Sequence, residues 1–226
     1  MPTEVERIIT LLIESFWPML KAGLQFSIPL TLITFASGIL LAFGIALARL
    51  YGGIILSNLA RLYVWIFRGT PLMVQLFIIF YGLPSVGIIL DGFTSAVIGF
   101  TLNVGAYASE TIRGSILGVS KGQWDAAHAL NLSKGQAMIY VILPQALRTA
   151  VPPLSNTFIS LVKDTSLAAA ITVTELFQVT QQITARTYEP LWLYIEAAAI
   201  YLMFSTLLTY LQQKLETKLN KAFATT

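Results

Sequence analysis

Several kinds of residue are scarce in this chain of 226 residues, and each scarcity excludes a class of protein. Cysteine is absent, which excludes disulfide scaffolds, thiolate metal sites and cysteine nucleophiles. The single histidine, His128, excludes multi-histidine zinc sites and argues against a Ser-His-Asp hydrolase. Charged residues make up 11% of the chain and hydrophobic residues 56%, whereas soluble domains carry about 25% charged residues. The composition therefore predicts a protein of the lipid bilayer.

The small excess of basic residues is interpreted as a signal of membrane topology. Fourteen lysines and arginines stand against eleven acidic residues, for a net charge of +3. No basic run is interleaved with aromatic residues, so we expect no nucleic-acid partner. In a membrane protein, an excess of Lys and Arg marks the cytoplasmic ends of the spans.

Long windows with few charges predict five membrane-spanning helices. The hydrocarbon core is about 30 Å thick and needs roughly 20 apolar residues in a helix, and the window 22–48 contains no charge at all. No internal repeat or low-complexity linker divides the sequence, so a single all-α membrane domain over 1–226 is expected. The predicted spans lie near 20–48, 56–84, 92–118, 136–162 and 190–214.

The charge distribution predicts an outside N-terminus and a cytoplasmic C-terminus. Basic residues cluster at one set of span ends, namely Arg49, Arg61, Arg113, Lys121, Lys134, Lys214, Lys218 and Lys221. Acidic residues dominate the opposite ends, among them Glu14, Asp91, Glu175 and Glu189. Acidic residues also interrupt the first twenty positions, so a short amphipathic helix on the outer interface is expected there in place of a signal peptide.

A short cytoplasmic helix is predicted between the third and fourth spans. Ser120–Gln123 and Ser133–Gln136 both fit the S-x-x-Q capping box, so a helix should begin after each serine. The first helix, near 121–132, would be about 18 Å long, which is too short to cross a bilayer. Periodicity alone leaves open a helix that only covers the ends of the spans.

The same segment resembles the EAA loop of ABC importer permeases. Asp125-Ala126-Ala127, then Asn131, then Val141-x-Leu143-Pro144 follow the spacing of that loop, with Asp in place of Glu, Asn in place of Gly and Val in place of Ile. Asp keeps the charge, and Asn tolerates a left-handed backbone. In that family the short helix docks on a separate ATPase. The resemblance therefore implies an ATPase-coupling surface formed by Trp124, Asp125, Ala126, Ala127, His128, Leu130 and Asn131.

Further motifs resemble the polar amino acid branch of these permeases, the histidine, glutamine and arginine type. They are Phe67-Arg68-Gly69-Thr70-Pro71-Leu72 with Gln75, Leu102-Asn103-x-Gly105-Ala106-Tyr107, Glu110-x-x-Arg113-Gly114, Ile142-Leu143-Pro144-Gln145-Ala146-Leu147-Arg148 and Leu161-x-Lys163-Asp164-Thr165-Ser166-Leu167. The resemblance implies the type I ABC importer permease fold in a bacterial or archaeal cytoplasmic membrane.

The same resemblance also implies the partners of the chain. They are a second permease copy or paralogue, two ATPase subunits, an extracytoplasmic binding protein and an amino acid substrate. No G-x-x-x-x-G-K-[ST] occurs in the sequence. ATP and Mg are therefore expected on the partner ATPase, with no catalytic residue, metal or cofactor on this chain.

Polar residues inside the predicted spans are the candidate substrate contacts, because buried charges in a membrane mark pathways or pairs. Arg68 precedes Gly69-Thr70-Pro71, which should kink or unwind the second span beside it. Asn103, Tyr107 and Glu110 form a stripe on the third span. Two alternatives stay open: Arg68 paired with Glu110 or Asp164, and Glu110 paired with Arg113.

A second polar cluster, Lys163-Asp164-Thr165-Ser166, ends the fourth span, either as an outer loop or as a break inside a buried hairpin. We expect Arg68 to bind the carboxylate of an amino acid and Glu110 or Asp164 its amino group or a basic side chain, which favours basic substrates. The predicted substrate-binding residues are Arg68, Thr70, Gln75, Asn103, Glu110, Asn156, Asp164 and Ser166.

Three rival functions differ in what they require of the sequence. A permease for methionine, phosphonate or another solute would conflict with the R-G-T-P and K-D-T-S matches. An ATP-independent channel or secondary transporter would use the buried charges for ion coupling and would leave the EAA spacing as coincidence. An intramembrane enzyme lacks a recognisable serine or paired-aspartate motif.

Overall fold

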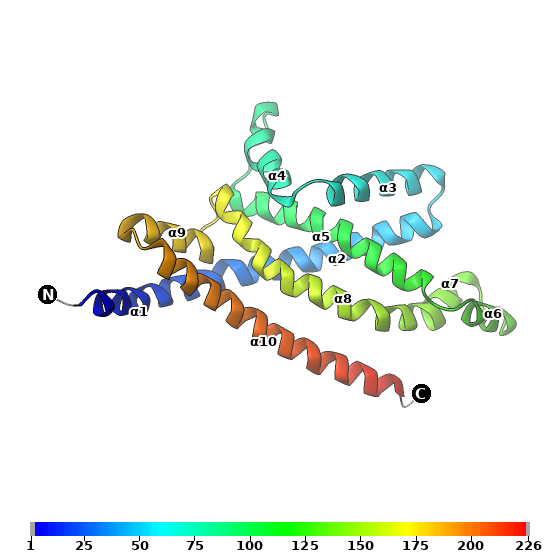
Figure 1. Cartoon of the computed structure of the whole chain (residues 1–226). Helices are drawn as coiled ribbons and strands as arrows, with labels where there is room; N and C mark the ends of the chain where they lie inside the picture. The colour runs from blue at the N-terminus through cyan, green and yellow to red at the C-terminus, as the bar shows by residue number, and fades with distance from the viewer. Residues whose placement is uncertain (1–2, 225–226) are drawn as a thin grey trace. The chain divides into compact units, whose positions relative to one another are not determined.

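The computed structural model describes residues 3–224 and is built from helices (Figure 1). Short π-helical turns (Gly23–Ser27, Ile78–Gly82, Met138–Ile142) and 3₁₀ turns (Leu83–Val86, Thr165–Ile171) join or interrupt the α-helices. The α-helices are α1 (Glu4–Ala22), α2 (Ile28–Tyr51), α3 (Ile54–Gly69), α4 (Leu72–Phe77), α5 (Gly92–Leu117), α6 (Lys121–Ala129), α7 (Lys134–Ala137), α8 (Leu143–Asp164), α9 (Leu176–Thr187) and α10 (Pro190–Ala224).

The chain begins with one long helical run. The Thr3 amide donates to the Glu6 carboxylate at 2.7 Å, and the Glu6 amide donates to the Thr3 hydroxyl at 3.2 Å, which forms a capping box at the start of α1. Helix α1 continues through Gly23–Ser27 into α2, so residues 4–51 form one run of 48 residues. At 1.5 Å per residue this run is about 70 Å long, more than twice the bilayer core.

Helix α1 is amphipathic, as the sequence predicts for residues 8–16. Ile9 and Ile13 are exposed on one face, whereas Ser15 and Met19 are buried on the other. The buried face packs against α9. Placement of α1 on the outer interface stays a prediction.

Two helical segments of the described residues are long and apolar enough to cross a membrane, Glu4–Tyr51 and Pro190–Thr217. A third qualifies if α3 and residues 72–86 together form one broken span. Helices α5 and α8, of 26 and 22 residues, are long enough to span. Both carry charged and amide side chains that lower their hydropathy. The predicted count of five spans therefore stays a prediction.

The contacts between residues divide the chain into two compact units. The first unit contains residues up to 35, 71–100 and 158–209, and the second contains 36–70, 101–157 and the residues from 210 onward. In the first unit, α1, α8, α9 and α10 share an apolar core around Met19, Val162, Leu176, Ile200 and Phe204.

The second unit brings α2 and α5 very close together. A Cβ atom added at Gly38 would lie 2.6 Å from Val104 Cγ1, and one added at Gly105 would lie 2.8 Å from Leu41 Cδ2. Each contact is too short for any side chain at the glycine position, so these glycines permit the close approach. Helices α6 and α7 lie together beside the ends of α5 and α8 (Figure 1).

Candidate functional site

The helix break predicted at Gly69-Thr70-Pro71 is present. Helix α3 ends at Gly69, and Thr70 (φ −119°, ψ 147°) and Pro71 (φ −64°, ψ 135°) have extended backbones before α4 begins at Leu72. Proline lacks an amide hydrogen and disfavours helical geometry at the preceding residue, which accounts for the break. Freed backbone groups at this position need protein or water as partners within a membrane.

Arg68 lies next to this break, in the last turn of α3. Its guanidinium carbon is 5.2 Å from the centre of the Tyr107 ring on α5, which is a cation–π contact. The Tyr107 hydroxyl also approaches the Arg68 carbonyl oxygen at 3.5 Å. Arg68 is exposed and makes no ion pair with any residue that the structure describes. Its charge is therefore held by an aromatic face and stays accessible.

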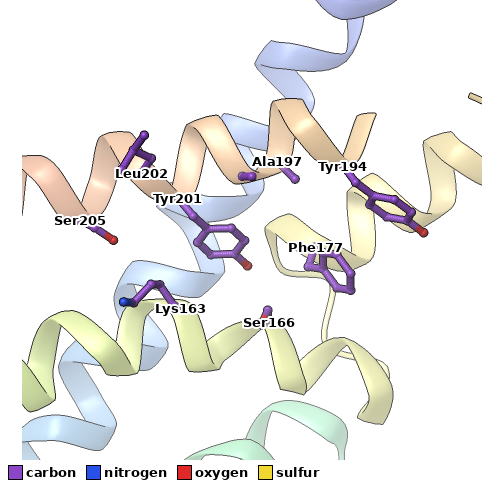
Figure 2. A pocket seen from close by; sticks show the side chains of 9 residues that line it. Lys163, Ser166, Phe177, Tyr194, Ala197, Tyr201, Leu202 and Ser205 are labelled. Carbon is purple, nitrogen blue, oxygen red and sulfur yellow. The ribbon is translucent and has the colours of Figure 1, made fainter. Parts of the chain in front are cut away.

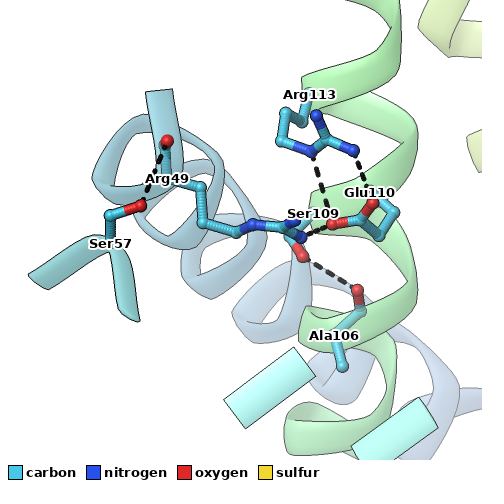
Figure 3. A network of polar contacts seen from close by, with 6 residues as sticks. All are labelled: Arg49, Ser57, Ala106, Ser109, Glu110 and Arg113. Atoms are coloured by element: carbon cyan, nitrogen blue, oxygen red, sulfur yellow. Dashed lines mark hydrogen bonds and ion pairs between the residues drawn. The ribbon is translucent and has the colours of Figure 1, made fainter. Parts of the chain in front are cut away.

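Glu110 lies at the centre of a charged cluster in the second unit (Figure 3). Its carboxylate pairs with Arg49 from the end of α2 and accepts a 2.9 Å bond from Arg113 Nη2 one turn further along α5. All three side chains are mostly covered, with exposed fractions of 16–28%. This is the ion-pair arrangement considered as the alternative for Glu110, extended by an arginine from a second helix.

The other predicted substrate contacts are divided between the two units. In the second unit, Asn103 is half-buried on α5, the Thr70 hydroxyl donates to the Ile66 carbonyl at 2.8 Å, and the Asn156 side chain accepts from Gln212 at 3.1 Å. In the first unit, Gln75 is buried on α4, Asp164 is exposed at the end of α8, and Ser166 is half-buried in the 3₁₀ turn. Within the second unit, Arg68 contacts Tyr107, which belongs to the same stripe of α5 as Asn103 and Glu110.

The segment predicted to couple to an ATPase forms α6 and the turn that follows it. Helix α6 ends at Ala129, three residues before the expected end, because Asn131 adopts the left-handed backbone with φ 55°. Ala127 is buried and Trp124 is half-buried. The outward side of the segment contains Asp125, Ala126, His128, Leu130 and Asn131, all exposed.

The two predicted capping boxes have different outcomes. At Ser133 the box forms, with the Gln136 amide 3.3 Å from the serine hydroxyl and the Ser133 amide 2.9 Å from the Gln136 side chain. At Ser120 the prediction is wrong, since Ser120 makes no side-chain cap. The Gln123 side chain instead accepts a 2.9 Å bond from Gln145 on α8. A hydrogen bond between helices has replaced the local one.

Sequence reasoning missed the role of Glu175, which it interpreted only as an acidic residue at the outer ends. The side chain is fully buried and caps α9, accepting a 2.8 Å bond from the Gln178 amide. It also accepts bonds from the Tyr201 hydroxyl of α10 at 2.8 Å and the Ser27 hydroxyl at 3.2 Å. Burial raises the pKa of the Glu175 carboxyl, while these hydrogen bonds oppose the rise. The sequence signal for this role was an acidic residue directly before the helix that begins at Leu176, a position at which a carboxylate can cap the helix.

A helical protein with membrane-length apolar helices, a break beside a free arginine and an exposed short helix between two long ones has the features of an ABC importer permease subunit. Residues 38–221 match the family of the binding-protein-dependent transport system inner membrane component, and the chain belongs to this family. It is therefore a multi-pass membrane protein and an amino acid permease subunit.

Relatives and solved structures agree with this assignment. The chain is 51% identical to the L-cystine transport system permease protein TcyB of Bacillus subtilis, over 93% of this chain and 91% of that protein. It is 35% identical to the glutamine transport system permease protein GlnP of Escherichia coli, over 89% and 93%. A crystal structure of an amino acid ABC transporter with histidines superposes with a TM-score of 0.81 at 31% identity, over 96% of this chain and all of the solved one.

Proposed function

We propose that this chain and a second copy or paralogue line the pathway of an ATP-driven importer for polar amino acids. In this proposal, ATP hydrolysis takes place on two separate ATPase subunits, and an extracytoplasmic binding protein delivers the substrate. The N-terminus lies outside and the C-terminus in the cytoplasm. The observation that carries the proposal is the exposed 121–132 segment, whose Asp125, His128 and Leu130 have no role in the core of the chain.

L-cystine is the first substrate to test. Its support is the 51% identity with a cystine permease subunit that covers nearly all of both chains. Glutamine, named in another relative, shares the same zwitterionic α-carbon group. We propose that Arg68 binds the substrate carboxylate, since its guanidinium is accessible and oriented by Tyr107. Neither of these two relatives is named for a basic substrate, so they give no support to the preference for basic substrates expected from the sequence.

Transmission from the ATPase to the pathway has a short physical route. Helix α6 follows α5 after three residues, 118–120, so that the two helices are covalently linked. Gln145 at the start of α8 donates both to Gln123 on α6 and to the Val141 carbonyl, each at 2.9 Å. A displacement of α6 by the ATPase is therefore passed to α5 and α8, two long helices that carry several of the predicted substrate contacts.

The docking role of α6 is tested by Leu130→Asp and Asp125→Lys. Both side chains are exposed, with 74% of Leu130 accessible, so neither change removes packing within this chain. Each should weaken association with the ATPase by at least about tenfold, the effect typical of losing an interface anchor. The measurement is the ratio of ATPase to permease recovered on affinity purification of tagged permease, together with ATP-dependent uptake in liposomes.

Glu14→Lys is the matched control, because it makes the same charge reversal at an exposed position of α1 outside the segment. We expect it to leave both the recovered ATPase ratio and uptake within about twofold of wild type. Full ATPase recovery with both α6 variants would contradict docking through this helix.

A further inference from the structure

An apolar groove in the second unit contains none of the predicted substrate contacts or coupling residues. It lies between α2, α5 and α8, has a volume of about 230 Å³, and is lined by Ile, Leu, Phe and Ala side chains. The cleft of the first unit differs, because Lys163, Ser166 and tyrosines line it (Figure 2). Since Ser166 is a predicted substrate contact, that cleft belongs with the proposed pathway, whereas the apolar groove is unsuited to a polar solute.

The groove follows one face of α8. Leu143, Leu147, Ala150 and Leu154 line it and recur at spacings of four, three and four residues, so they share one face of the helix. The rise of about 1.5 Å per residue from Leu143 to Leu154 gives a length of about 16 Å. This length is close to half of the hydrocarbon core of about 30 Å. The groove therefore has the depth of one leaflet of a bilayer.

Small residues of α8 create the groove, and large exposed ones border its opening. Ala146 and Ala150 are each only 2% exposed, and their short side chains leave space that a leucine would fill. Leu40 of α2 and Leu147 of α8 also line the groove, yet they are 77% and 48% exposed. The groove is therefore open to the surroundings of the protein, which in a membrane are acyl chains.

A charged and an aromatic side chain lie toward the Leu143 end of the groove. Arg148 directly follows the groove residue Leu147 and is exposed. Side chains of an α-helix are tilted toward its N-terminus, which is the direction of Leu143, and long arginine side chains reach a membrane interface in this way. Tyr140, three residues before Leu143, is 71% exposed, and tyrosines are enriched at the same interface. The predicted topology places this end of α8 at the cytoplasmic leaflet.

An acyl chain fits the groove better than a helix or a zwitterion does. A helix is about 10 Å wide, so a 16 Å length of one occupies about 1,250 Å³, several times the volume of the groove. A zwitterion would find no hydrogen-bond partner among these apolar side chains. An acyl chain restores the dispersion contacts that an empty apolar space lacks. Arg148 adds charge complementarity, because a guanidinium group can bind two phosphate oxygens at once.

We propose that this groove binds one acyl chain of an anionic phospholipid of the cytoplasmic leaflet, and that Arg148 binds the phosphate of the same lipid. Cytoplasmic leaflets are rich in anionic lipids. A zwitterionic headgroup has its own cation, which competes with Arg148 for the phosphate, so the site prefers a headgroup with net negative charge. The site goes beyond the proposed function, since it does not depend on the solute that is transported.

The test is native mass spectrometry of the purified permease–ATPase complex in detergent, titrated with phosphatidylglycerol or with phosphatidylcholine of the same acyl chains. At the tightest site, wild type should bind phosphatidylglycerol about tenfold more tightly than phosphatidylcholine. Arg148→Gln should bring the two affinities to within about twofold of each other. Arg186→Gln, at an exposed position of α9 in the first unit, is the matched control and should keep the preference of wild type.

Ala150→Leu tests the groove separately from the charge. The larger side chain fills the groove, so thermal stability should be unchanged or higher, while the affinity for both lipids falls by about fivefold or more. Ala36→Leu adds the same atoms at an exposed position of α2 outside the groove, and it should stay within about twofold of wild type. Arg148→Gln changes an exposed side chain, so it tests the site even where Ala150→Leu folds poorly.

Several results would overturn the inference. Equal lipid affinities of Ala150→Leu and wild type would show that the groove holds no acyl chain, and a tenfold preference kept by Arg148→Gln would show that Arg148 does not bind the headgroup. Displacement of the lipid by glycerol phosphate at equal concentration would show that only the anion is recognised. Loss of a second permease copy from Ala150→Leu, with lipid binding unchanged, would assign the groove to that copy. Uptake is not measured here, so failure of the importer assignment would leave this test intact.

Discussion

Replacing Glu175 with alanine is expected to lower the stability of the permease by about 3–5 kcal/mol, because three hydrogen-bond donors lose their acceptor and a buried cavity is created. Those donors are the Gln178 amide, the Tyr201 hydroxyl and the Ser27 hydroxyl. For a chain of this size the midpoint of thermal unfolding in detergent should fall by about 10 °C. Fluorescence-detected size-exclusion chromatography after heating provides the measurement.

Two variants provide controls for Glu175. Glu175→Gln keeps the shape and one acceptor oxygen, and its NH2 group can donate to the Tyr201 and Ser27 hydroxyls, so it should lose only about 1 kcal/mol. Glu189→Ala removes the partner of Arg7 in an ion pair of the same unit whose arginine is 55% exposed, and should cost less than about 1 kcal/mol. A midpoint of Glu175→Ala equal to that of Glu189→Ala would show that the buried contacts are dispensable.

The raised pKa of Glu175 also gives a pH dependence with a defined sign. A carboxyl group whose folded-state pKa lies above its unfolded value stabilises the fold most below the unfolded value, about 4.3, and this contribution is lost as the pH rises through the folded-state pKa. The midpoint of wild type should therefore fall relative to that of Glu175→Gln as the pH is raised above this range. Parallel midpoints of the two proteins across the range would contradict a raised pKa.

The second large effect is expected from Glu110→Ala. Without this carboxylate, Arg49 and Arg113 lose their shared partner and repel each other, and Arg49 is only 16% exposed. Because the cluster is mostly covered but not fully buried, the expected loss of stability is about 2–4 kcal/mol. The thermal midpoint should drop even without substrate, and uptake should fall in proportion to the folded protein.

The double variant Arg49→Gln with Glu110→Gln distinguishes an ion pair from a substrate ligand. If the pairing with Arg49 is the main role of Glu110, the double variant should be more stable than Glu110→Gln alone, since the unpaired arginine is gone. An unchanged midpoint of Glu110→Ala together with a tenfold weaker affinity for the substrate would instead assign Glu110 to substrate binding.

Features set by local chemistry could be predicted from the sequence. The helix break at Thr70-Pro71 follows from the backbone of proline, and the helix start at Lys134 follows from the Ser133 capping box. The assignment as a permease could be predicted from the motifs within residues 67–72, 102–114, 142–148 and 161–167, because they occur in the order and spacing of the family. The junction of α1 and α2 depends on tertiary packing, because Gly23 lies against Phe204 and Leu176, and local sequence does not decide between a bend and the π-helical turn Gly23–Ser27.

Contacts between distant elements could not be predicted. Glu110 has an obvious partner three residues away, but Arg49 lies 61 positions earlier and its approach depends on the glycine-mediated packing of α2 on α5. Glu175 and Tyr201 belong to different helices, and neither residue has a local signal for the other. The Gln123–Gln145 bond likewise replaced a capping box that local sequence favours. In each case a tertiary interaction decided the role of a polar side chain.

Uptake of radiolabelled L-cystine tests the proposed function most directly. The permease, purified with its ATPase, is reconstituted into liposomes with the binding protein on the outside and ATP or a non-hydrolysable analogue at the ATPase face. We expect accumulation against a gradient only with ATP, competed by unlabelled cystine, and lost in Leu130→Asp. Accumulation that is equal with the analogue would contradict an ATP-driven importer and would favour an ATP-independent transporter.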